Sequence, residues 1–170
     1  MGPTVGRVLA LLRRPFTPEE AREVAGWAYP PPFDLYDSDP GNAELFVDRD
    51  PDGSGYYPAV DDDGRVVAFA VVGTEARVRG QEPADGVMDV GMGVRPDATS
   101  DGLGTALVGQ VLELARDLGA TSARAAVAVF NERSLALCRS AGFRPVRDFE
   151  GPGGRTFREL ARPLRAGCPA

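Results

Sequence analysis

The fold of this chain is decided by the loop Val94-Arg95-Pro96-Asp97-Ala98-Thr99-Ser100-Asp101-Gly102-Leu103-Gly104-Thr105-Ala106, which an apolar strand precedes and a strong helix follows. Small residues and two glycines fill this loop, so its backbone stays accessible to a ligand. The first amides of a helix have no intrahelical partner, and the helix dipole favours an anion beside them. The sequence therefore predicts a phosphate cradle built from backbone amides.

The segment after the loop has the spacing of an amphipathic helix. Apolar side chains recur on one face at Leu103, Leu107, Val111, Leu114 and Leu118. Gly119 is a natural stop. A buried strand is predicted over residues 122–130, after which Asn131 can cap a helix that reaches Ser140.

The other elements predict a mixed sheet. Thr17 and Glu20 form a capping box for a helix that ends at about Trp27. The acidic turn at residues 61–64 joins two apolar runs in a hairpin. Further strands are expected at 5–12, 87–94, 142–149 and 155–162, and a short helix at 42–47. We expect one α/β domain over residues 1–170, with its core from about 5 to 163 and six or seven strands in a mixed α+β sheet.

Composition excludes several kinds of chemistry. The chain of 170 residues has a net charge of −6, which argues against nucleic acid and favours a cationic small molecule. It contains no lysine and no histidine, so a Ser-His-Asp triad, a histidine metal site and a lysine Schiff base are all excluded. Two cysteines indicate a reducing, cytoplasmic setting, and no apolar run is long enough to span a membrane. No metal site is expected.

The glycine loop by itself is a weak signal, because a turn at a helix start needs no ligand. A dinucleotide site would require a third glycine, and Leu107 stands at that position. The loop also lies past the middle of the chain rather than in an early βαβ unit. A nucleotide-binding protein is therefore kept only as a competing hypothesis.

The full set of motifs resembles the GCN5-related N-acetyltransferase (GNAT) superfamily. The set comprises Val94-x-Pro96, Gly102 and Gly104-Thr105-Ala106, then Asn131-Glu132-Arg133-Ser134 with Leu137 and Gly142-Phe143. The resemblance implies a fold of mostly antiparallel strands with a central, splayed parallel pair and about four helices. It also implies acetyl-CoA as the acyl donor and a primary amine as the acceptor, attacked directly in a ternary complex.

The same resemblance assigns the coenzyme to particular residues. The pantetheine arm would enter the gap beside the strand that ends at Val94 and pair with backbone groups near Met92 and Val94. Amides from Thr99 to Thr105 would hold the pyrophosphate, and Asn131 would contact the arm. The cofactor-binding set is thus Met92, Val94, Thr99, Ser100, Gly102, Gly104, Thr105 and Asn131.

Two features depart from the family pattern. Thr99 and Ser100 stand where relatives carry Arg or Gln followed by glycine, which removes one side-chain contact to the coenzyme. Cys138 stands where many relatives carry a tyrosine that protonates the leaving thiolate. The thiol of Cys138 could donate that proton, or the residue could fill space in the core.

Asp89 is the candidate general base. It shares one strand face with Gly91 and Gly93, a pattern that suggests the wall of a cleft. The alternative is a salt-bridged aspartate. Asp37 and Glu44 are reserve candidates for holding a cationic amine.

The acceptor site is expected at the aromatic segment with Trp27, Tyr29 and Tyr36, whose rings can contact an ammonium group. The alternative is that these rings pack the first helix against the sheet. A small-molecule amine is favoured. Acetylation of a protein N-terminus is less favoured because Ala126 replaces a glutamate of that branch. A non-catalytic acyl-CoA-binding domain is the competing function, and a homodimer stays open.

Overall fold

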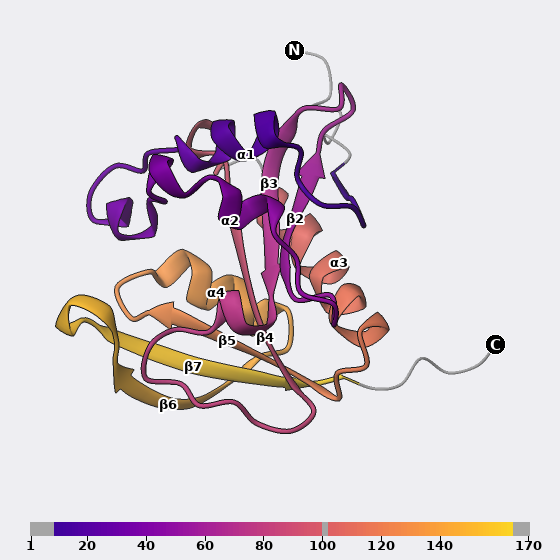
Figure 1. The fold of residues 1–170 in the computed structure, drawn as a ribbon. Helices are drawn as coiled ribbons and strands as arrows, with labels where there is room; N and C mark the ends of the chain where they lie inside the picture. Colours follow the sequence, from indigo (N-terminus) through magenta and orange to yellow (C-terminus); the bar gives the residue numbers. More distant parts are fainter. Residues whose placement is uncertain (1–8, 100–101, 165–170) are drawn as a thin grey trace, which may run out of the picture.

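The computed structural model describes residues 9–99 and 102–164 and contains a seven-stranded sheet of order β1-β2-β3-β4-β5-β7-β6 (Figure 1). The strands are β1 (Ala10–Leu11), β2 (Gly55–Val60), β3 (Val66–Val72), β4 (Val87–Val94), β5 (Ser122–Ala128), β6 (Arg144–Glu150) and β7 (Thr156–Pro163). Neighbouring strands are antiparallel except β4 and β5, which are parallel. The predicted mixed, mostly antiparallel sheet with a central parallel pair is confirmed.

Four α-helices flank this sheet within the described ranges: α1 (Pro18–Ala25), α2 (Glu44–Val47), α3 (Leu103–Asp117) and α4 (Glu132–Ser140). The capping box predicted at Thr17 is present, because its hydroxyl accepts from the Glu20 amide while the Glu20 carboxylate accepts from the Thr17 amide. The Asn131 Oδ1 atom likewise accepts from the Ser134 amide and caps α4. Local sequence therefore starts both helices as predicted.

The two faces of the sheet bury different side chains. Small and branched residues of β3 and β4, such as Ala70 and Val90, pack under the leucines of α3 in the main core. On the opposite face, Phe69 of β3 packs with Phe46 of α2 and with residues of α1 in a second core. Because strand side chains alternate between faces, one strand serves both cores.

The parallel pair opens after three residues. The register joins Val87 to Ser122, Met88 to Ala123 and Asp89 to Arg124, and no further pairs follow. In Figure 1, β4 stands steeply while β5 runs across the lower part of the molecule beside β7 and β6. The sheet is thus split into two parts that meet only at the start of β4.

Several element boundaries differ from those predicted. The first strand covers Ala10–Leu11, and residues 5–8 of the predicted strand lie outside the described residues. Strand β5 ends at Ala128 rather than at Phe130, because the Asn131 amide turns back to the Ala128 carbonyl at 2.9 Å. A 3-10 turn at Pro40–Asn42 precedes α2, so the short helix begins at Glu44 rather than at Asn42.

Within the described residues, no helix is both long and apolar enough to cross a bilayer.

The close approach of Phe69 to β4 depends on Gly93. A Cβ atom at Gly93 would overlap the Phe69 ring, which is itself held by Trp27, Phe46 and Tyr56. We expect Gly93→Ala to lower the free energy of unfolding by about 2 kcal/mol, since the crowded ring cannot yield.

Gly109→Ala is the matched control, because Gly109 is exposed in α3 and an added Cβ meets nothing within 4 Å. This change should raise the free energy of unfolding by about 1 kcal/mol through helix propensity. Urea unfolding measures both values, and an equal effect of the two substitutions would contradict the packing argument.

Candidate functional site

The open gap between β4 and β5 exposes backbone groups of β4. The Arg95 amide donates to the Val67 carbonyl of β3 at 2.9 Å. In an antiparallel ladder the residues alternate in direction, so the amide groups of Val94 and Met92 face β5 instead. Because β5 has already diverged, none of the described strands pairs with these groups on that side. The gap can therefore pair with an extended ligand through main-chain hydrogen bonds.

Two tyrosines of the segment between α1 and α2 reach the two sides of this gap. The Tyr29 hydroxyl donates to the Val94 carbonyl at 2.7 Å on the β4 side. On the other side, the Asn131 amide nitrogen donates to the Tyr36 hydroxyl at 3.3 Å. Tyr29 is half-buried, and burial, aided by the Asp37 carboxylate, raises its pKa to about 12. It is therefore a hydrogen-bond donor at neutral pH.

A hollow of about 420 Å³ lies between the start of α3 and the side of α4. It is lined by Thr99, Gly102, Gly104, Thr105, Arg133, Ala136, Leu137 and Ser140. Gly102 is the N-cap of α3, with a left-handed φ of 73° and no side-chain cap. Among the described residues, no side chain caps the first amides of α3, and these amides face a space that could hold an anion.

Glycine is favoured at position 104 by the packing of α3 against α4 as well as by the access that it gives to the backbone. A Cβ atom there would lie 3.1 Å from the Leu137 Cδ2 atom of α4. Glycine therefore allows α3 and α4 to approach each other and sets the width of the hollow. Ser100, also predicted to contact the coenzyme, lies outside the described residues.

Arg133 is a hollow-lining residue that the sequence reasoning did not single out. It projects from the first turn of α4, and its Nη1 atom donates to the Thr99 carbonyl at 3.2 Å. A guanidinium thus stands beside the unpaired amides of α3. Its place in the motif with Asn131 was visible in the sequence, but only the packing of α4 against the loop brings its charge to the hollow.

Asp89 forms a buried ion pair at the point where the two strands part. Its side chain is 1% exposed. Arg124, its register partner on β5, donates to Oδ1 at 2.6 Å and to Oδ2 at 3.0 Å, and Arg77 donates to Oδ2 at 2.9 Å. The hydrogen bonds that Arg124 donates to the Asp89 carboxylate raise the pKa of Arg124. The last residue pair of the parallel ladder is therefore joined by charge-assisted hydrogen bonds from Arg124 and Arg77 to Asp89, and this group of three side chains is called the clasp below.

This geometry contradicts the expectation that Asp89 forms an open cleft wall. Both carboxylate oxygens accept from guanidinium groups, and almost no solvent reaches them. A proton taken up by this carboxylate would leave two cations without their partner. Asp89 is therefore the salt-bridged aspartate of the alternative interpretation.

A second buried carboxylate extends the network. Glu159 of β7 accepts from Gln81 at 3.0 Å and from Arg147 at 3.2 Å, and it lies 3.7 Å from Arg124. Arg124 also donates to the Glu82 carbonyl, and Arg147 donates to the Gly80 carbonyl. The loop from 77 to 86 is thereby fastened to the sheet by side chains of β5, β6 and β7.

Cys138 packs against the main core from α4 and is half-buried. Burial raises the pKa of its thiol to about 11. An unperturbed thiol has a pKa of about 8.5, so Cys138 would be a weaker acid than a coenzyme thiol with that pKa, which it would have to protonate. The space-filling interpretation of Cys138 is favoured.

Trp27 contributes to packing. Its indole stacks on Phe69, with ring centroids 6.1 Å apart, and this contact holds the end of α1 against β3. Tyr29 and Tyr36, in contrast, direct their hydroxyls to the gap. Across the described ranges, no group of three or more acidic or cysteine side chains is placed to hold a metal ion.

The comparisons with known proteins agree with this geometry. The sequence profile of the Acetyltransferase (GNAT) family matches residues 12–143. No curated protein matches the chain.

Solved structures match at low sequence identity. A phosphinothricin acetyltransferase of the GNAT superfamily from Sinorhizobium meliloti, in complex with acetyl-CoA, is 20% identical, with 94% of this chain and 89% of that one covered and a TM-score of 0.68. A ribosomal-protein-alanine N-acetyltransferase from Brucella melitensis is 20% identical, covering 92% and 99%, with a TM-score of 0.71. An aminoglycoside acetyltransferase in complex with coenzyme A is 17% identical, covering 94% and 96%, with a TM-score of 0.72. These likenesses show the fold.

The clasp predicts a large stability effect at Asp89. Asp89→Asn should lower the free energy of unfolding by about 3 kcal/mol, because Arg77 and Arg124 lose their charge partner in a buried place. Urea unfolding is the measurement. Asp62→Asn is the control, since Asp62 is exposed in the turn between β2 and β3 and should change stability by no more than about 0.5 kcal/mol. Equal stability of the two variants would show that the clasp contributes little.

Proposed function

The chain belongs to the acetyltransferase (GNAT) family, and from this membership we propose that it transfers an acetyl group from acetyl-CoA to a primary amine of a small cationic molecule. The gap between β4 and β5 carries this proposal. It offers unpaired main-chain groups along one edge, an anion-favouring hollow at one end and two tyrosine hydroxyls across it.

The donor would lie with its diphosphate in the hollow and its pantetheine arm in the gap. The residues present suit that molecule, because the α3 amides and Arg133 supply positive potential without lysine or histidine. The amide groups of Met92 and Val94 supply strand-like partners for the arm. Tyr29 would then compete with the arm for the Val94 carbonyl, so we expect its hydroxyl to change partner when the donor binds.

The acceptor side favours a cation. Residues 23–48 contain six carboxylates and no arginine. The hydrogen bonds of Tyr29 and Tyr36 hold this segment across the gap. The Asp37 carboxylate accepts from the Tyr29 amide at 2.8 Å and lies close enough to that ring to raise the pKa of its phenol. Asp37 is therefore placed to attract a second ammonium group of an acceptor.

The reaction needs a neutral amine. The nitrogen lone pair attacks the thioester carbonyl carbon, the carbon–sulfur bond breaks, and the amine loses one proton while the leaving thiolate takes one up. Backbone amides near Met92 and Val94 can stabilise the charge that develops on the carbonyl oxygen. Both carboxylate oxygens of Asp89 accept from arginines, and Cys138 is a weak acid. The proton that the amine loses and the proton that the thiolate gains would therefore both move through water.

Other parts of the proposal follow from the sequence. The two cysteines favour a cytoplasmic setting. Ala126 makes a protein N-terminus a less favoured acceptor than a small molecule. A homodimer stays a prediction.

Donor binding is tested at Arg133. Arg133→Gln should weaken coenzyme A binding about fivefold to tenfold, because one charge-assisted contact to the diphosphate is lost. Calorimetric titration with coenzyme A measures this change. The control is Arg139→Gln, which removes the same charge from the same helix but lies outside the lining of the hollow. Equal weakening in both variants would contradict the assigned diphosphate position.

Turnover is tested by coenzyme thiol release with a panel of amines. The panel contains a polyamine, an aminoglycoside, a neutral monoamine and a peptide with an N-terminal alanine. We expect the two polycations to give the highest kcat/KM. Release with the peptide alone would favour N-terminal acetylation, and acetyl-CoA binding without release for any amine would favour the non-catalytic domain.

Asp37→Asn keeps an oxygen acceptor for the Tyr29 amide and removes the charge. It should raise KM for a polycation about fivefold, equivalent to about 1 kcal/mol for an exposed ion pair, and leave KM for the neutral amine unchanged. Asp34→Asn is the control, since it removes the same charge from the same segment. An equal rise in KM for charged and neutral amines would contradict the electrostatic role.

A further inference from the structure

Two arginines stand apart from the other half-buried arginines of the chain. Seven of the described arginines are partly buried: Arg49, Arg77, Arg95, Arg116, Arg124, Arg158 and Arg162. Five of them donate side-chain hydrogen bonds to a carboxylate or a carbonyl. Within residues 9–99 and 102–164, Arg116 and Arg162 make no such bond and no ion pair, and both line the same hollow.

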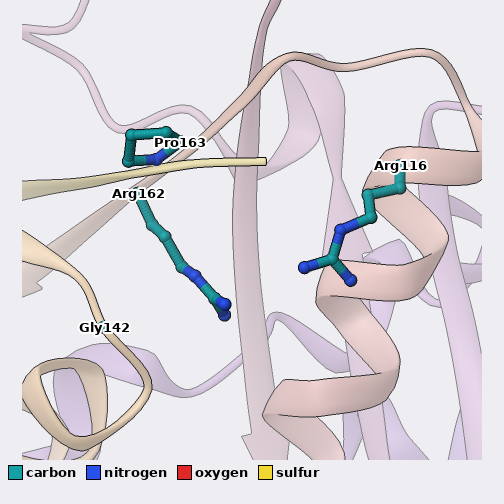
Figure 2. Close-up of a pocket in the computed structure, with 4 residues that line it drawn as sticks. All are labelled: Arg116, Gly142, Arg162 and Pro163. Carbon is teal, nitrogen blue, oxygen red and sulfur yellow. The ribbon is translucent and has the colours of Figure 1, made fainter. Parts of the chain in front are cut away.

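That hollow has a volume of about 370 Å³ and is lined by Arg116, Gly142, Arg162 and Pro163. Three elements build it. Arg116 comes from the last turn of α3, Gly142 from the turn after α4, and Arg162 and Pro163 from the end of β7. Figure 2 shows the guanidinium groups of Arg116 and Arg162 directed into the space between α3 and the end of β7.

Gly142 lies directly beside Arg162 in this hollow. A Cβ atom at Gly142 would lie 3.4 Å from the Arg162 Nε atom, an ordinary van der Waals contact distance. The φ of 89° at Gly142 favours glycine, which ends α4 at this point. The Arg162 side chain therefore lies against a bare stretch of main chain.

The charge balance of the hollow is unlike that of the whole chain. The chain carries a net charge of −6, yet two cations line this hollow. The adjacent carboxylate Asp117 pairs with Arg13 at 3.0 Å. Half-buried guanidinium groups that share a hollow repel each other and have lost part of their hydration, so a counter-anion between them lowers the free energy of both.

We propose that this hollow binds a small oxyanion of charge −2, a phosphate or a dicarboxylate. Each guanidinium can present its fork to one pair of oxygens, and two arginines neutralise a dianion. No residue that lines this hollow lines the hollow between α3 and α4, so the site is separate from the one assigned to acetyl-CoA. The proposal does not depend on the acetyl-transfer activity.

The test is a calorimetric titration of the full chain with inorganic phosphate and with succinate. Acetate and chloride serve as monoanion controls, and ionic strength is kept constant because surface electrostatics are screened by salt. Saturating coenzyme A is added in parallel to occupy the other hollow. We expect one site for a dianion that persists in the presence of coenzyme A. Phosphate binding without succinate binding would identify a tetrahedral phosphate group as the ligand, and the reverse would identify a dicarboxylate.

Arg116→Gln and Arg162→Gln should each weaken dianion binding about tenfold, the loss of one charge-assisted pair. Arg22→Gln is the matched control, since Arg22 is an exposed arginine in the last turn of α1. It should leave the affinity unchanged.

Three results would overturn the proposal. The first is dianion affinity that is unchanged in the Arg116→Gln, Arg162→Gln double variant. The second is complete displacement of the dianion by coenzyme A. The third is the lack of binding of either dianion at millimolar concentration.

Discussion

The ion pair between Asp89 and Arg124 is the constraint on which the site depends. These two residues are register partners at the last rung of the parallel ladder, and beyond them β4 and β5 no longer pair. A buried charge-assisted contact at this point holds the two halves of the sheet together where main-chain hydrogen bonds stop. The amide groups of Met92 and Val94, which β5 does not pair, lie further along β4. Arg77, at the start of the loop from 77 to 86, donates to the same carboxylate. Asp89 therefore holds both the point where the two strands separate and the position of this loop.

Arginine takes over several roles in this lysine-free chain. Its planar fork can contact a carboxylate and a carbonyl at once, as Arg124 does with Asp89 and Glu82 and as Arg147 does with Glu159 and Gly80. Arg133 joins a helix to the loop beside the hollow that we assign to the donor. Arg116 and Arg162, which have no such partner among residues 9–99 and 102–164, face a separate hollow, and their charge is the basis of the oxyanion proposal. Residues 23–48, which span the segment between α1 and α2, carry six carboxylates and no arginine.

Glycine positions in β4 and α3 allow large side chains to approach the backbone. Phe69 packs across Gly93 of β4 and also stacks on Trp27, which follows α1. The Phe69 ring therefore contacts both β4 and the end of α1. Gly104 allows Leu137 to approach α3 and so sets the distance between the two helices that line the hollow. The widths of the gap between β4 and β5 and of the hollow between α3 and α4 are therefore set by close packing on both faces of the sheet.

The sequence alone determined the elements, because capping boxes, helical spacing and acidic turns act over a few residues. Thr17, Asn131 and the leucines of α3 are placed as predicted, and the full set of motifs from Val94 to Phe143 led to the correct family. Only the tertiary structure decided what the side chains of the site contact. Asp89 reads in sequence as a carboxylate beside two glycines, whereas Arg124 lies 35 residues away and Arg77 on a loop without a motif. Arg133 reaches the hollow only because α4 folds back on the loop before α3. Such contacts join residues that are distant in the chain, and no local pattern encodes the partner of a buried charge.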